Sequence, residues 1–102
     1  MTQHTITHQP TILRIIREHG MDGHVKPQNP KDPGCVCLFP ATPDGTFCLI
    51  ENRSGTYKLI LLKQANLKEA MSFMESYVAT HVEHPGKPRV SIVKIPSDPS
   101  NN

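Results

Sequence analysis

The sequence has no tryptophan and few other aromatic residues, three phenylalanines and two tyrosines among 102 residues. So few rings offer little for the stacking of nucleic-acid bases. Runs of like charge are also absent, and eleven Lys and Arg against nine Asp and Glu give a net charge of only +2. This balance argues against a basic stripe that follows a phosphate backbone.

Targeting and membrane-spanning segments are lacking as well. The N-terminus, "MTQHTITHQP", has neither the basic start nor the apolar stretch of a signal peptide, and no window approaches the roughly 18 apolar residues of a membrane span. Three cysteines without a CxxC motif are typical of reduced thiols rather than of a disulfide framework. We therefore expect a single-domain cytoplasmic protein with no membrane partner.

Motifs that carry chemistry are missing too. There is no Gly-rich phosphate loop, no HExxH metal motif and no Ser-His-Asp signature, and the carboxylates show no acid–base pairing. Structural zinc would need a fourth ligand beside Cys35, Cys37 and Cys48, so we expect these three to be packed in a core. We predict no catalytic residue, metal or cofactor, and keep a small cysteine- or metal-dependent enzyme as a third hypothesis.

Proline, in contrast, is abundant, and its ten copies confine regular structure to separate segments. Between them the patterns predict one α+β domain in the order α-β-β-β-α-β. Its elements are a helix over 10–19, strands over 35–39, 46–52 and 57–63, a long helix that starts near Asn66, and a strand over 89–95. We expect flexible ends over 1–8 and 96–102 and a long loop over 20–34, whose role the sequence leaves open.

The three central strands are predicted to form an antiparallel meander. A two-residue turn at Ser54 and Gly55 pairs the residues of one face as Glu51 with Lys58, Leu49 with Ile60, and Phe47 with Leu62. The other face then carries Cys48, Ile50, Asn52, Tyr57, Leu59 and Leu61. Both faces are apolar, whereas a sheet with one wet face alternates apolar and polar residues.

Two further expectations concern the ends of this meander. If the loop between its first two strands spans 40–45, Cys48 lies opposite Cys37. A right-handed crossover would make the strand over 89–95 parallel to the strand over 57–63, next to it or one strand away.

Both apolar faces need a cover. The long helix, of about 17 residues with a capping box at Asn66 and Glu69, supplies one through a helical stripe. That stripe comprises Leu67, Ala70, Met71, Met74, Tyr77, Val78 and Val82. The other face must be covered by the helix over 10–19, by the loop over 20–34 or by another copy of the chain. Because the first helix is only about 15 Å long, we expect a second copy or a partner.

These patterns favour a small non-catalytic interaction or regulatory protein that acts through an apolar sheet surface. It would associate with itself as a homodimer or bind another protein, through Phe47, Leu49, Ile60, Leu62 and the nearby Ile15. The alternative is a nucleic-acid-binding module with a basic hairpin, whose contacts would be Arg53, Lys58, Lys63 and Lys68.

Overall fold

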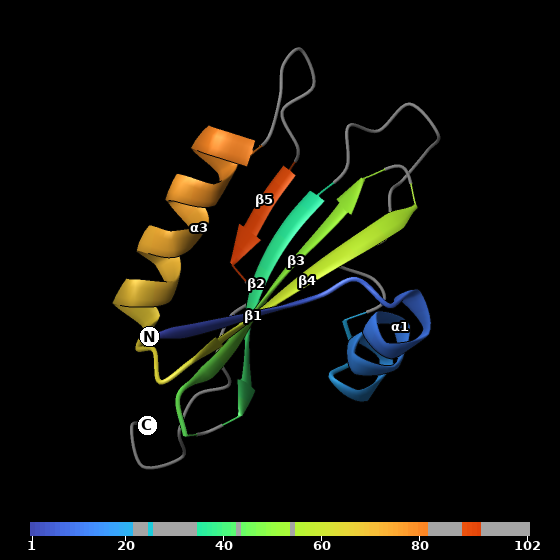
Figure 1. Cartoon of the computed structure of the whole chain (residues 1–102), viewed down its shortest axis with the longest axis horizontal. Helices are drawn as coiled ribbons and strands as arrows, with labels where there is room; N and C mark the ends of the chain where they lie inside the picture. Colours follow the sequence, from blue (N-terminus) through green and yellow to red (C-terminus); the bar gives the residue numbers. More distant parts are fainter. Residues whose placement is uncertain (22–24, 26–34, 43, 54, 82–88, 93–102) are drawn as a thin grey trace.

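The computed structural model describes residues 1–21, 25, 35–42, 44–53, 55–81 and 89–92. A five-stranded sheet, in the order β1-β4-β3-β2-β5, lies between one helix on each face (Figure 1). The elements are β1 (Thr2–Ile6), α1 (Gln9–Glu18), β2 (Cys35–Thr42), β3 (Thr46–Arg53), β4 (Thr56–Lys63), α3 (Leu67–His81) and β5 (Arg89–Ile92). The predicted α+β class is confirmed, with one strand more than the sequence patterns indicated.

The additional strand is β1, within the segment that was expected to be a flexible end. Residues Thr2–Ile6 pair antiparallel with β4, so that Thr2 lies opposite Lys63 and Ile6 opposite Leu59. The expectation of a flexible end over 1–8 is therefore wrong for these residues. An edge strand of β-branched Thr and Ile residues can keep polar side chains exposed, and it then lacks the periodic apolar signal. The other expected flexible end, 96–102, lies outside the described residues.

The predicted meander and its register are confirmed for β3 and β4. Phe47 lies opposite Leu62, Leu49 opposite Ile60, and Glu51 opposite Lys58. Arg53 lies opposite Thr56, as a two-residue turn requires. Gly55 has a φ of +88°, a left-handed conformation that glycine adopts without steric cost.

Strand β2 is longer than predicted, and its pairing with β3 corrects one expectation. Cys48 lies opposite Phe39, whereas Cys37 lies opposite Ile50. The expected pair of Cys37 with Cys48 is therefore wrong, because the strand continues through Pro40 with a register shift before Thr42. The three cysteines nevertheless belong to one buried cluster on one face.

Strand β5 is parallel to β2, and hence to β4, as the crossover predicted. Its predicted position, next to β4 or one strand away, is wrong, because both β3 and β2 lie between β4 and β5. The outer edge of β4 is occupied by β1, so the crossover through α3 reaches the free edge of β2 instead. The strand ends at Ile92, and the rest of its predicted range, 93–95, lies outside the described residues.

The first helix has the predicted punctuation. Pro10 lies in its first turn, and Gly20 follows its end with a φ of +67°. The helix buries Ile12 and Ile16 against the sheet. Its C-terminal end reaches β2, because the Nε2 atom of His19 lies 3.1 Å from the carbonyl oxygen of Ala41.

The second helix begins with the predicted capping box. The backbone N–H of Asn66 donates to Glu69 Oε1 at 3.0 Å, and the N–H of Glu69 donates to Asn66 Oδ1 at 2.8 Å. Of the predicted stripe, Ala70, Met74 and Tyr77 are buried, and Met71 and Val78 pack beside them. Leu67 is 40% exposed, and Val82 lies outside the described residues.

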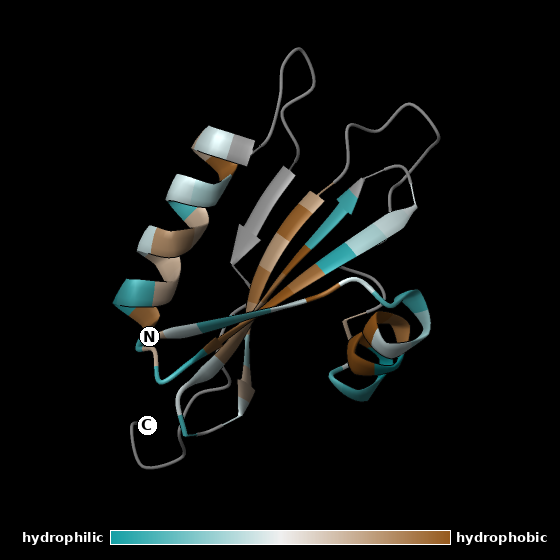
Figure 2. Cartoon of the chain, viewed as in Figure 1, coloured by the Kyte–Doolittle hydropathy of each residue, from teal (hydrophilic) through white to brown (hydrophobic). Residues whose placement is uncertain are grey.

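Each sheet face has its own apolar cluster. Figure 2 shows brown, hydrophobic residues along the central strands between the two helices. The α3 face contains Val36, Leu38, Phe47, Leu49, Ile60, Leu62, Ala65, Ala70, Met74 and Tyr77. The α1 face contains Ile12, Ile16, Met21, Val25, Cys35, Cys37, Phe39, Cys48, Ile50 and Leu59. The second face is thus covered by this chain itself, through α1 together with Met21 and Val25 from the predicted long loop.

Candidate functional site

The residues predicted to form an apolar interaction surface lie in the core. Phe47, Leu49, Ile60 and Leu62 are at most 6% exposed, because α3 packs over them. Ile15 is half-buried against the opposite cluster, on the α1 face. The expectation that these residues form an exposed surface for a partner is therefore corrected, because α3 covers the face on which four of them lie. The stripe of α3 indicated this cover, but the pattern did not show which face it would take.

The cysteines form a packed group rather than a reactive one. None of Cys35, Cys37 and Cys48 forms a disulfide, and all three are buried. The Sγ of Cys35 donates to the carbonyl oxygen of Val25 at 3.3 Å. Burial raises the pKa of Cys48 to about 12, which keeps this thiol protonated at neutral pH. A nucleophilic cysteine needs the opposite shift. Among the described residues, no group of three His, Cys, Asp or Glu side chains could hold a metal ion.

Asn52 is the one buried polar side chain of the described core, and it connects two parts of the α1 face. Its Nδ2 donates to the carbonyl oxygen of Val25, and its Oδ1 accepts from the N–H of Gly55 at 3.0 Å. The Asn52 amide therefore connects Val25, which helps to cover the α1 face, to the turn between β3 and β4. Sequence reasoning placed Asn52 on the correct face but did not find this role, which depends on a backbone carbonyl 27 residues away.

The residues of the predicted basic hairpin do not form one patch. Lys58 lies on the α3 face, with Nζ 5.6 Å from the ring centroid of Tyr77, whereas Lys63 is exposed on the opposite face at the end of β4. Arg53 directly precedes the turn between β3 and β4, at the opposite end of the hairpin from Lys63. Lys68 is exposed in the first turn of α3. Lys58 and Lys63 alone are separated by about 17 Å along the strand. The nucleic-acid hypothesis stays a prediction with no contiguous surface to support it.

A polar group joins α3 to the sheet at the same face. The Tyr77 hydroxyl donates to Glu51 Oε1 at 2.6 Å, and Lys58, which pairs with Glu51 across the strands, lies over the Tyr77 ring. Phe73 stacks on Tyr77 at a centroid distance of 6.3 Å. Tyr77 itself is 5% exposed, so we interpret this arrangement as a structural tie for the helix.

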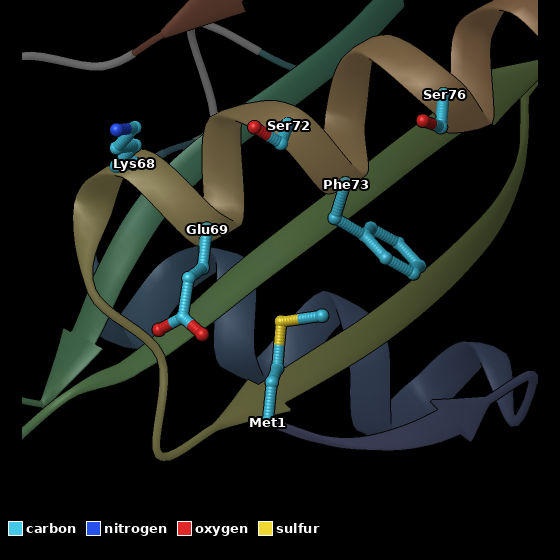
Figure 3. Close-up of a pocket in the computed structure, with 6 residues that line it drawn as sticks. All are labelled: Met1, Lys68, Glu69, Ser72, Phe73 and Ser76. Carbon is cyan, nitrogen blue, oxygen red and sulfur yellow. The ribbon is translucent and has the colours of Figure 1, made fainter.

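A shallow pocket of about 420 Å³ lies between α3 and the start of β1. Figure 3 shows the Met1 side chain pointing up from β1 towards the helix, between Glu69 and Phe73. The other residues that line the pocket, Lys68, Ser72 and Ser76, also belong to α3. Met1 is 47% exposed, and the pocket has a mainly apolar surface and opens to solvent.

Strand β1 lies at one edge of the described sheet, with β4 as its neighbour on the inner side. Thr2 to Thr5 are exposed, and Ile6 is half-buried. The strand "TQHTI" contains no Lys, Arg, Asp, Glu or Pro, the residues with which natural proteins protect an edge strand from pairing. Its β-branched residues were the available sequence signal, but too few apolar positions accompany them. The opposite edge strand, β5, is flanked by residues outside the described part of the chain.

No helix within the described residues is long and apolar enough to cross a membrane. Comparison with family models, curated proteins and solved structures finds no match for this chain. Fold and function are therefore argued from its own residues.

Proposed function

We propose that this chain is a small, non-catalytic interaction protein that associates with itself through the outer edge of β1. The observation that carries the proposal is the exposed strand Thr2–Ile6, which has neither charge nor proline to prevent backbone pairing. An edge of this kind can add a strand from another chain. The proposal moves the contact from a sheet face, as expected from the sequence, to a sheet edge.

The packing of the two faces supports this choice. Each face is closed by a helix of the same chain, and the buried residues of both clusters are at most 6% exposed. Apolar side chains of the faces are therefore not available to a partner without removal of a helix. At the β1 edge, in contrast, backbone donors and acceptors can pair without any change of the core.

The chemistry of the described residues supports binding rather than catalysis. The thiol of Cys48 is made less acidic by burial, and Glu51 is engaged by Tyr77. The proposal includes a cytoplasmic location, which is supported by three cysteines that form no disulfide.

Sedimentation velocity over a concentration series tests the proposal. Two short strands bury less than the roughly 1,200 Å² of a standard interface, so the expected dimer is weak. We expect the sedimentation coefficient to rise between about 10 and 1,000 µM, a range typical of weak association.

A matched pair of variants at Thr5 connects this association to the edge. Thr5→Pro removes a backbone donor and should abolish the rise, whereas Thr5→Val keeps the backbone donor and should preserve it. A monomer throughout the series, or equal association of both variants, would overturn the proposal.

A further inference from the structure

The direction of the hydrogen bonds at the β1 edge follows from one side chain. The side-chain amide of Gln9 makes the two hydrogen bonds that a neighbouring strand would make with Tyr57. Its Oε1 accepts from the N–H of Tyr57 at 2.9 Å, and its Nε2 donates to the Tyr57 carbonyl at 2.8 Å. Tyr57 therefore points both backbone groups towards the β1 side of β4. Because these directions alternate along a strand, Leu59, Leu61 and Lys63 point theirs the same way.

The partners of these three residues in β1 are Ile6, His4 and Thr2. Their backbone groups are thus directed inward, to β4, and by the same alternation Gln3 and Thr5 direct theirs to the open side. The next outward carbonyl, that of Thr7, already accepts from Gln9 Nε2 at 2.8 Å. The free edge therefore presents a short window of two residues, bounded at one end by Gln9.

We infer that two copies of this chain pair antiparallel through β1, with a two-fold axis at His4. In this register Gln3 of each copy lies opposite Thr5 of the other, and His4 lies opposite His4. Both outward-facing residues of each copy then form hydrogen-bonded pairs, which exchange two N–H···O bonds each. The two sheets join into one, with both α3 helices on the same face. This inference rests on the proposed function.

Other antiparallel registers leave some of the outward backbone groups of Gln3 and Thr5 without a suitable partner. An axis at Gln3 pairs Thr5 with Met1, which lies outside β1, and an axis at Thr5 pairs Gln3 with Thr7, whose carbonyl is occupied by Gln9. Only the axis at His4 matches the two outward residues with each other.

The side chains also suit a second copy. The strand contains no Lys, Arg, Asp or Glu, so no pair of like-charged residues of these types, which would destabilise cross-strand pairing, faces across the two copies. Among the described residues no strand pairs with the outer edge of β1, because β1 ends the strand order and its inner edge is paired with β4. Helix α3 comes near the strand at Met1, one residue before its start. Within the part of the chain that the structure describes, the β1 edge is thus available to another strand.

Disulfide trapping tests the register. In a pair that is not hydrogen-bonded, opposite Cβ atoms lie about 4.5–5.5 Å apart, close to the distance that a disulfide spans. We expect His4→Cys to form a covalent dimer rapidly when oxidised with copper phenanthroline at a concentration where the unmodified protein associates. Gln3→Cys alone and Thr5→Cys alone should form it at least about tenfold more slowly, because the diagonal positions are roughly 7 Å apart or more. A mixture of these two variants should give the mixed dimer.

The unmodified protein is the background control, since its three cysteines are buried. If sedimentation shows a dimer but Gln3→Cys or Thr5→Cys alone is trapped faster than His4→Cys, the register is wrong and self-association stands. If sedimentation shows only monomer, the proposed function fails together with this inference. Pairing of two copies through β1 is also excluded if trapping of His4→Cys is no faster than that of Ser72→Cys, on the exposed surface of α3.

Discussion

The two faces of the sheet are closed by unequal means. The α3 face is covered by a helix of 15 residues, which contributes bulky side chains such as Met74 and Tyr77 to the cluster on that face. The α1 face has a helix of 10 residues, and its cluster contains three small thiols together with Met21 and Val25. A short helix thus suffices where part of the sheet face is made of small residues and the following segment adds two side chains. The difference teaches that helix length alone does not decide whether a sheet face needs a partner.

The largest expected effects come from neighbouring residues that point to opposite faces of β3. Leu49, towards α3, and Ile50, towards α1, are 1% and 0% exposed. If both faces are closed equally well, Leu49→Ala and Ile50→Ala should each lower the free energy of unfolding by about 2–5 kcal/mol. Urea denaturation of a dilute sample measures both.

Leu67→Ala serves as the control, because this leucine is 40% exposed and its loss should cost less than about 0.5 kcal/mol. A cost for Ile50→Ala close to that of the control, beside a full cost for Leu49→Ala, would show that the cover of the α1 face is loose.

Asn52→Ala is expected to cost about 2 kcal/mol, because a buried side chain loses its hydrogen bonds to the Val25 carbonyl and from the Gly55 N–H. The Val25 carbonyl keeps the weaker Cys35 Sγ donor. Asn66→Ala, which removes an exposed helix cap, should cost about 1 kcal/mol under the same conditions. Thermal or urea unfolding compares the two. Equal costs would mean that Val25 is not held to the sheet by this amide.

Tyr77→Phe addresses the α3 face and should cost about 1 kcal/mol through loss of the hydrogen bond to Glu51. A double-mutant cycle with Glu51→Gln isolates the pair. We expect the two substitutions to be less than additive, since either one weakens the same contact. Strict additivity would argue that the hydroxyl and the carboxylate do not interact in solution.

The smallest effect is the pH dependence that Cys48 contributes on the α1 face. Its pKa is raised from 9.0 to about 12 by burial, so the unfolded chain loses this proton at lower pH than the folded chain. The contribution to stability is complete below pH 9.0 and is lost as the pH rises towards 12, with a loss of about 1 kcal/mol by pH 10.

The comparison with Cys48→Ala separates this contribution from other alkaline titrations. Urea denaturation between pH 8 and 10 should show a shallower decline of stability in the variant. Identical slopes would contradict a buried, protonated Cys48 thiol.

The parts of the fold that sequence reasoning predicted are those held by local rules. The capping box at Asn66 and Glu69 fixed the start of α3, and a two-residue turn with Gly55 set the register of β3 against β4. The alternation of side chains then placed Asn52 and Cys48 on one face and Glu51 and Lys58 on the other. Each of these inferences needs only residues that are close in sequence or paired through one turn.

The parts that escaped prediction depend on contacts between distant segments. Met21 and Val25 lie in a stretch without periodicity, so their burial under the sheet had no signature in the sequence. Strand β1 was missed because its exposed polar residues resemble those of a frayed end. The candidate interaction edge was missed for the same reason. The predicted surface residues Phe47, Leu49, Ile60 and Leu62 are buried because α3 covers their face, and the sequence did not show which face this helix would cover.

The double hydrogen bond between Gln9 and the backbone of Tyr57 has a consequence for the order in which the molecule opens. Gln9 is the first residue of α1, so the same side chain that ends the ladder of β1 with β4 also anchors the helix. Peeling of β1 from the sheet would release this anchor, and the N-terminal strand and helix should exchange their amide hydrogens as a single cooperative unit. Pairing of β1 with a second copy would therefore slow the exposure of the buried cysteines on the α1 face, far from the point of contact.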